Sequence, residues 1–264
     1  MKKQWILGGA GLLAAAVLVG CLWLARQPVE TAPETGMKKL ETVEKIAAEE
    51  PRKNMLPGLD TDAVTAAMPE ADQAAFTLFL PVLRGEAAFQ WVAGPYDGNE
   101  STWEPIDATL ADFHDQLWDG FAIEDPPETL TLDRLAVQDV DGDGELELVL
   151  LFQDGAYQYL ILRREGETVY GTSMGVRWFE ELQTSGVYIG SGGAGDHTYH
   201  RMTFEDGRFA DRELARKVEG ASGAVYTLDG QETTKEAFDG WYAENMPGGV
   251  IWYAPDGTPF QDGM

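Results

Sequence analysis

Acidic residues occupy alternate positions of the segment DVDGDGELE, with two glycines between them. They are Asp139, Asp141, Asp143, Glu145 and Glu147. A hard cation such as Ca²⁺ takes about six to eight oxygen ligands, and a tightly wound loop can bring alternate side chains onto one ion. Gly144 permits the sharp turn, because glycine tolerates positive φ. We therefore expect these carboxylates to bind calcium, except that Glu145 contributes its backbone carbonyl.

An EF-hand does not account for this loop, because its twelfth position is Leu150 instead of glutamate and both flanks are patterned as strands. The segment from Leu135 to Leu148 resembles the calcium loop of FG-GAP and VCBS-type extracellular proteins, which is D-x-D-G-D-G-x-x-[D/E]-L between two strands. The resemblance implies that the three aspartates and Glu147 bind calcium between the strands. The motif occurs once, so the propeller that those families build by repetition is not implied.

A plain hairpin turn is the alternative for this segment, since Asp-Gly pairs between apolar runs also favour β-turns. Four carboxylates held about 5 Å apart repel by ~0.8 kcal/mol per pair even in water. That repulsion opposes a compact loop without a cation. We therefore expect one Ca²⁺ ion as the cofactor, with an empty turn as the other possibility.

A second motif has the spacing of a catalytic site. Residues 171–175 read GTSMG and match the G-x-S-x-G nucleophile elbow, with His197 or His200 downstream of Ser173. An elbow needs a central parallel strand that feeds a helix, whereas this match follows a predicted hairpin in a chain without β-α-β alternation. We expect a turn between strands and no catalytic residues. An extracytoplasmic serine hydrolase that uses Ser173 stays open as an alternative.

The histidines and a glycine-rich segment offer further candidate sites. His197 and His200 are three residues apart, which on a strand sends them to opposite faces, so a shared zinc ion is not expected. Residues 190–195, GSGGAG, fit G-x-G-x-x-G, but the sequence that follows alternates like a strand instead of opening a helix. A phosphate cradle is therefore not expected, although such a loop could line a ligand surface.

Aromatic residues near the C-terminus leave a third function open, a carbohydrate or cell-wall binding module. They are Trp241, Tyr242, Trp252 and Tyr253. Their helical and strand spacing favours packing in the core over a platform on which sugars stack.

The pattern of apolar residues predicts the elements that position these sites. Helical spacing recurs over 76–83, where Pro81 should kink or end the helix, and over 106–117. Seven β-type runs follow between residues 130 and 229, and a capping box at 233–236 precedes a helical stripe and a VIWYA strand. Helices cluster instead of alternating with strands. We expect an α+β fold with N-terminal helices packed on a mainly antiparallel sheet, one inter-strand calcium loop, and a C-terminal helix and strand.

The N-terminus has the pattern of an export signal, with MKKQ followed by an apolar run over 5–25. Residues 18–21 read LVGC and resemble the lipobox of bacterial lipoproteins, in which the chain is cut before the cysteine and the Cys21 thiol carries a diacylglycerol. The run continues past Cys21, so a single-pass N-terminal anchor is the alternative. In both cases Lys2 and Lys3 place the rest of the chain on the extracytoplasmic face of the cell membrane.

Composition sets the domain boundaries and excludes one class of partner. We expect a signal peptide or anchor over 1–20, a lipidated N-terminus and flexible tether over 21–58, and an extracytoplasmic domain over 59–264. The chain has 19 Lys and Arg against 45 Asp and Glu, a net charge of -26. Such a surface repels phosphate backbones, so no nucleic-acid partner is expected.

The whole layout is similar to uncharacterised surface lipoproteins of Gram-positive gut bacteria. The likeness rests on the export anchor, the helices, the single acidic loop, and a tail that contains VYIGSGG, HRMTF and VYTLDG. We expect a membrane-anchored, calcium-stabilised binding or interaction lipoprotein without catalytic activity. Its partner would be an unknown extracellular protein or glycan.

Overall fold

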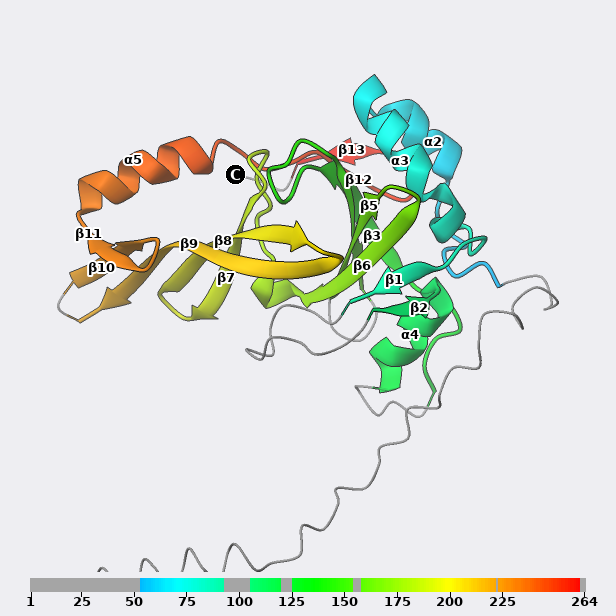
Figure 1. Cartoon of the computed structure of the whole chain (residues 1–264), viewed down its shortest axis with the longest axis horizontal. Helices are drawn as coiled ribbons and strands as arrows, with labels where there is room; N and C mark the ends of the chain where they lie inside the picture. Colours follow the sequence, from blue (N-terminus) through cyan, green and yellow to red (C-terminus); the bar gives the residue numbers. More distant parts are fainter. Residues whose placement is uncertain (1–52, 93–104, 120–124, 154–157, 222, 262–264) are drawn as a thin grey trace, which may run out of the picture. The chain divides into compact units, whose positions relative to one another are not determined.

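The protein has an α+β fold in which the strands form two sheets, as the computed structural model describes for residues 53–92, 105–119, 125–153, 158–221 and 223–261 (Figure 1). The eight-stranded sheet comprises β1 (Phe89–Trp91), β2 (Ile106–Ala108), β3 (Leu132–Gln138), β4 (Glu147–Phe152), β5 (Gln158–Glu165), β6 (Thr168–Gly175), β12 (Trp252–Tyr253) and β13 (Pro259–Phe260). Its order is β13-β12-β3-β4-β5-β6-β1-β2. Among its described strand pairs, β1 and β6 are parallel and the others are antiparallel.

The second sheet has five strands, all joined by antiparallel pairings. They are β7 (Val187–Gly193), β8 (Asp196–Glu205), β9 (Arg208–Gly220), β10 (Gly223–Leu228) and β11 (Gln231–Thr233). The sheet has the order β11-β10-β9-β8-β7. The expectation of mainly antiparallel pairing is therefore confirmed, but the strands divide between two sheets.

The helices lie at the two ends of the described chain and beside β2. They are α2 (Thr61–Ala67), α3 (Glu70–Leu83), α4 (Leu110–Asp119) and α5 (Lys235–Asn245). Pro81 lies inside α3, which ends two residues later, as expected for a residue that cannot donate to the helix ladder. The helical pattern expected over 106–117 is partly wrong, because Ile106 belongs to β2 and pairs with Trp91. Thr234 caps α5 by accepting a hydrogen bond from Ala237 N–H.

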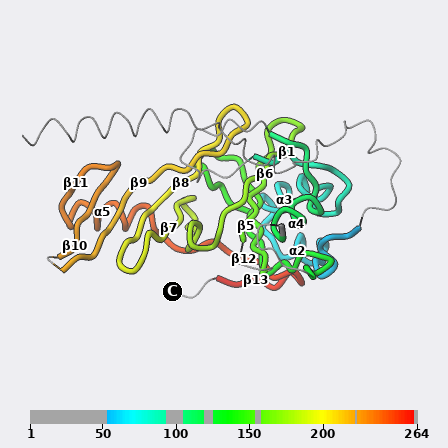
Figure 2. Tube along the Cα trace, turned by 90° about the horizontal axis from the view of Figure 1, so that it is seen from below, coloured from blue at the N-terminus to red at the C-terminus, as the bar shows by residue number. Residues whose placement is uncertain are grey.

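The core has apolar layers on both faces of the eight-stranded sheet. Every residue of β4 is buried. Leu148, Leu150 and Phe152 pack on the side of α2, α3 and α4, while Val149 and Leu151 pack on the side of the second sheet. Burial on both faces explains why this strand is an almost continuous apolar run instead of an alternating one. Figure 2 shows the helices α2, α3 and α4 on one side and β7 to β11 with α5 on the other.

Packing begins before the predicted domain start, because Met55 and Leu56 are buried in the core formed with α2 and α3.

A separate apolar cluster lies between α5 and the five-stranded sheet, centred on Phe238, Tyr199 and Ile189. The second sheet is therefore stabilised by α5 on one face and joins the main core through residues such as Tyr188.

Candidate functional site

The acidic loop connects two neighbouring strands of the eight-stranded sheet. Gln138 at the end of β3 pairs with Glu147 at the start of β4, so residues 139–146 form the connection of an antiparallel hairpin. Strands on both flanks were expected from the sequence, and this is confirmed. The hairpin places the first and last acidic residues of the segment beside each other.

Two glycines let the loop wrap around Asp139. Gly142 and Gly144 have φ of 82° and 93°, which glycine adopts without the steric cost that a side chain would add. Their N–H groups point inward: Gly142 donates to Asp139 Oδ1 at 2.6 Å, and Gly144 donates to Asp139 Oδ2 at 3.0 Å. The Asp139 carboxylate is therefore fixed in the middle of the turn.

Backbone N–H groups also fix one oxygen of three further carboxylates, those of Asp141, Asp143 and Glu147. Asp141 Oδ1 accepts from Asp143 N–H at 3.2 Å, and Asp143 Oδ1 accepts from Glu145 N–H at 2.9 Å. Glu147 Oε2 accepts from Val140 N–H at 2.8 Å. Each of these three carboxylates keeps its second oxygen for another partner.

Arg163 on β5 takes up the second oxygen of all three carboxylates. Its Nη1 donates to Asp141 Oδ2 and, at 3.0 Å, to Glu147 Oε1, while its Nη2 donates to Asp143 Oδ2 at 2.5 Å. One guanidinium thus joins most of the predicted calcium ligands. Sequence reasoning missed this residue, and its only signal was a pair of arginines closing an apolar strand, YLILRR.

The Arg163 side chain is buried between the acidic loop and the second sheet. Its side chain is 9% exposed, and its Cζ atom lies 4.6 Å from the ring centre of Phe204 on β8. An arginine over an aromatic face gains from the ring quadrupole, more so when water is excluded. The guanidinium is therefore held by carboxylates on one side and by a ring on the other.

Burial and charge shift the pKa values of this cluster in different directions. Burial raises the pKa of Glu147 to about 8, and the hydrogen bond from Val140 and the charge of Arg163 only partly oppose it. Burial likewise raises the pKa of Asp141. For Asp143 and Arg163 burial acts against the charged form, but their mutual hydrogen bond and the other nearby charges prevail, so the pKa of Asp143 is lowered and that of Arg163 is raised.

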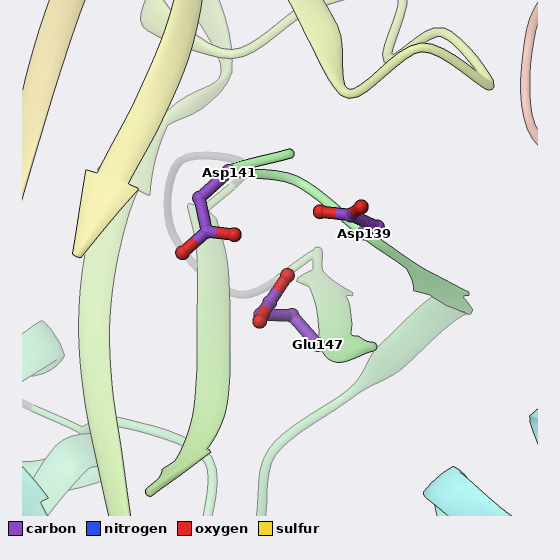
Figure 3. A group of neighbouring side chains, drawn as sticks. All are labelled: Asp139, Asp141 and Glu147. Carbon is purple, nitrogen blue, oxygen red and sulfur yellow. The ribbon is translucent and has the colours of Figure 1, made fainter. Parts of the chain in front are cut away.

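Three of the predicted ligands converge closely enough to hold a metal ion. Asp139, Asp141 and Glu147 each offer a carboxylate oxygen, and these oxygens lie within 4.8 Å of one another (Figure 3). Asp143 is tied to the same cluster through Arg163, and Glu145 is exposed. A donor set made only of oxygens fits hard cations such as Ca²⁺ and Mg²⁺ better than zinc or copper.

The loop also touches the turn that leads into β7 of the second sheet. A Cβ atom at Gly186 would lie 2.6 Å from the backbone oxygen of Asp139, so only glycine allows this approach. Nearby, Gln138 Nε2 donates to Thr184 O at 3.1 Å. The position of the loop is thus coupled to the start of the five-stranded sheet.

A second arginine borders the loop from β8. A Cβ atom at Gly142 would lie 3.4 Å from Arg201 Nη1, and Arg201 Nη2 donates to Ser185 O at 3.0 Å. The loop therefore lies between Arg163 of the eight-stranded sheet and Arg201 of the five-stranded sheet. It is the point where both sheets supply positive charge to the same acidic segment.

The residues of the nucleophile-elbow motif lie on different sheets. Residues 171–175 belong to β6 instead of the expected turn, and a short 3₁₀ helix, η2 (Val176–Trp178), follows. Ser173 is therefore part of the eight-stranded sheet. His197 and His200 lie on β8 of the five-stranded sheet.

The two histidines have different environments, as the strand alternation predicts. His197 is exposed, whereas His200 is buried. His200 Nδ1 lies 2.8 Å from Asp211 Oδ2, and its ring stacks on Tyr188 with centroids 5.8 Å apart. Tyr188 in turn donates its hydroxyl to Asp211. His200 thus belongs to a polar cluster that joins β7, β8 and β9.

The glycine-rich segment 190–195 forms the end of β7 and the turn into β8. A Cβ atom at Gly190 would lie 2.8 Å from Thr198 Oγ1, and one at Gly192 would lie 2.5 Å from Asp196 Oδ2. These glycines leave room for side chains of the neighbouring strand. Their spacing therefore has a packing reason that requires no phosphate.

The C-terminal aromatic residues pack mostly as expected. Trp252 and Tyr253 are buried in the core. Trp241 and Tyr242 of α5 meet the ring of Tyr199 edge-on, with centroids 5.5 and 5.7 Å away. Tyr242 is 39% exposed, so one edge of this cluster reaches the surface.

The expected signal peptide or membrane anchor lies outside the described residues. This holds for the apolar run over 5–25 and for Cys21 within it. Within the ranges that are described, no helix combines the length and the apolar character needed to cross a membrane.

Comparisons of the chain with protein-family models, with curated proteins and with solved structures find no match.

Proposed function

We propose that this protein is an exported, membrane-anchored binding lipoprotein whose fold is stabilised by Ca²⁺ at the acidic loop. The observation that supports the proposal best is the convergence of carboxylate oxygens from Asp139, Asp141 and Glu147 within 4.8 Å of one another. In a chain with a charge of -26, such crowding is costly unless a cation is close. A divalent ion would neutralise more of the loop than one guanidinium can.

The role proposed for each ligand follows from its position in the hairpin. Asp139 and Glu147 face each other across the loop, so an ion held by both would join the end of β3 to the start of β4. Asp141 and Asp143 would complete the carboxylate set, and Glu145 would add its backbone carbonyl. This assignment matches the single-copy FG-GAP and VCBS-type loop, with an affinity on the order of 0.1 to 1 mM.

The proposed location outside the cell agrees with a calcium site of such modest affinity. Lipidation of Cys21, or an uncleaved apolar anchor, would hold the chain at the membrane with the domain outside the cell. Calcium sites of extracellular modules need only modest affinity. The ion would then act as a structural part of the exported domain.

Binding of an extracellular protein or glycan is the activity we propose for the domain. The five-stranded sheet supports this role, because it extends away from α2, α3 and α4 (Figure 1) and places apolar side chains in solvent. Val218 of β9 and Val225 of β10 pair across the strands and are 36% and 48% exposed. The calcium loop, at the junction of the two sheets, would keep this sheet firmly oriented.

The proposal is tested by thermal unfolding of the full chain in detergent, with either millimolar CaCl₂ or a chelator. We expect a higher melting temperature with calcium, which grows with the calcium concentration as binding to the folded state requires. Glu145→Gln is a matched control, because it removes an exposed carboxylate but keeps the backbone carbonyl. Equal melting temperatures with calcium and with chelator would show that the loop needs no metal.

A further inference from the structure

We propose that Arg163 and a divalent cation are alternative occupants of the acidic loop, so that calcium binds only as the guanidinium withdraws. This inference rests on the proposed function and specifies how the same site is regulated. Its structural basis is the cluster of hydrogen bonds that Arg163 makes to Asp141, Asp143 and Glu147.

The two cations would compete for oxygens of Asp141 and Glu147, two of the three residues whose oxygens converge. Backbone N–H groups hold Oδ1 of Asp141, Oδ1 of Asp143 and Oε2 of Glu147. The oxygens that remain are the ones to which Arg163 donates. A calcium ion that coordinates these oxygens directly therefore has to replace the guanidinium hydrogen bonds.

Close packing prevents the two charges from sharing the loop. The Arg163 side chain is nine-tenths buried, and its Nε atom is buried without a hydrogen-bond partner among the described residues. Two positive charges within about 4 Å repel strongly where little water screens them. The site thus favours one cation at a time over both together.

Phe204 already packs against the guanidinium of Arg163, so withdrawal of the guanidinium from the carboxylates must alter this contact. The ring centre of Phe204 is 4.6 Å from Arg163 Cζ, and the ring packs on Phe209 and Tyr170. Phe204 belongs to β8, so movement of the guanidinium changes a contact between the two sheets. Replacement of Arg163 by calcium in the loop would therefore change a contact between β5, next to the hairpin of β3 and β4, and the five-stranded sheet.

The proposal is tested by calorimetric calcium titration of the full-length chain and of Arg163→Met. Methionine keeps an unbranched apolar side chain over Phe204 but removes the competing charge. We expect calcium to bind Arg163→Met at least about tenfold more tightly, since charge-assisted hydrogen bonds no longer have to be broken. Arg164→Met is the matched control, because Arg164 is the next residue of β5 and is exposed. Its affinity should equal that of the unaltered chain.

The outcomes separate this inference from the function on which it rests. Calcium binding with equal or weaker affinity in Arg163→Met overturns the competition and leaves the calcium site intact. The absence of calcium binding in all three chains overturns both.

A second measurement applies if Arg163→Met does not fold. In the unaltered chain, the ¹⁵N signal of Arg163 Nε, assigned with Arg163→Lys, should shift as calcium saturates the site. Saturation without such a shift overturns the inference, because the guanidinium would then have stayed in place.

Discussion

Arg163 Nη1 donates a hydrogen bond to Glu147 Oε1 at 3.0 Å, and both side chains are almost fully shielded from solvent. The two residues lie on the neighbouring strands β5 and β4. Pairing favours the charged form of Glu147 and burial favours its neutral form, and burial prevails, since the pKa of Glu147 is raised to about 8. Arginine alone therefore does not fully compensate the charge of this carboxylate. A divalent cation at this position would remove the remaining free-energy cost of burying the charged carboxylate of Glu147.

Replacing Glu147 with glutamine should abolish most of the calcium response but cost little stability without calcium. Glutamine can still accept the hydrogen bond from Val140 N–H, and burial already favours an uncharged group at this position. We expect a loss below about 1.5 kcal/mol in chelator, the net worth of one hydrogen bond. Melting temperatures with and without calcium measure both effects. Glu145→Gln should retain the full calcium response, and a retained response in Glu147→Gln would contradict the ligand assignment.

Stability without divalent cations should fall as the pH rises from about 4.5 to about 8. The pKa of Glu147 is raised in the folded protein, so in this window the folded state keeps a proton that the unfolded chain has released. The stabilisation from this retained proton is complete below about pH 4.5 and is lost as the pH rises through the folded-state pKa of Glu147. The free energy of unfolding falls by up to about 1.4 kcal/mol per pH unit in this window. Urea unfolding in chelator at several pH values tests this slope. Glu147→Gln should flatten it, and an unchanged slope in that variant would assign it to another group.

The loop could be predicted from the sequence because its geometry is local. Alternating acids and two glycines within nine residues determine how the backbone turns around Asp139. Arg163 could not be predicted in the same way. It lies 16 residues beyond Glu147, and only the pairing of β5 with β4 brings its side chain to the loop.

Prediction of the strands from the sequence has a similar limit. The apolar strand β4 is evident from its composition, but β9, the long strand Arg208–Gly220, was not predicted. Most β9 residues are polar and only Phe209 and Ala215 are buried, so the strand lacks a clear apolar alternation. It is held by pairing with β8 and β10 on its two edges. Such support depends on the tertiary structure and leaves little trace in the local sequence.

Cys21→Ser should prevent lipid modification of the chain. Because Cys21 is the only cysteine, any thioether-linked diacylglycerol must be attached there. We expect incorporation of a labelled fatty acid into the unaltered chain in a bacterial host and none in the variant. An unlabelled chain that stays in the membrane fraction would favour the uncleaved anchor over residues 5–25. Labelling that persists in Cys21→Ser would contradict the lipobox assignment.

Alanine at Gly186 should destabilise the protein more than alanine at Gly144, because it adds a steric clash to backbone strain. Both glycines have positive φ, 79° and 93°, which costs alanine about 1–2 kcal/mol. At Gly186 the new Cβ would also lie 2.6 Å from the backbone oxygen of Asp139, whereas Gly144 has open space around it. Urea midpoints give the two losses, with Gly58→Ala as a control, since nothing lies within 4 Å of that position either. Moving Asp139 also disturbs the proposed ligand set, so Gly186→Ala should in addition weaken the calcium response. Equal losses at both positions would mean that the loop can shift away from the turn before β7 without cost.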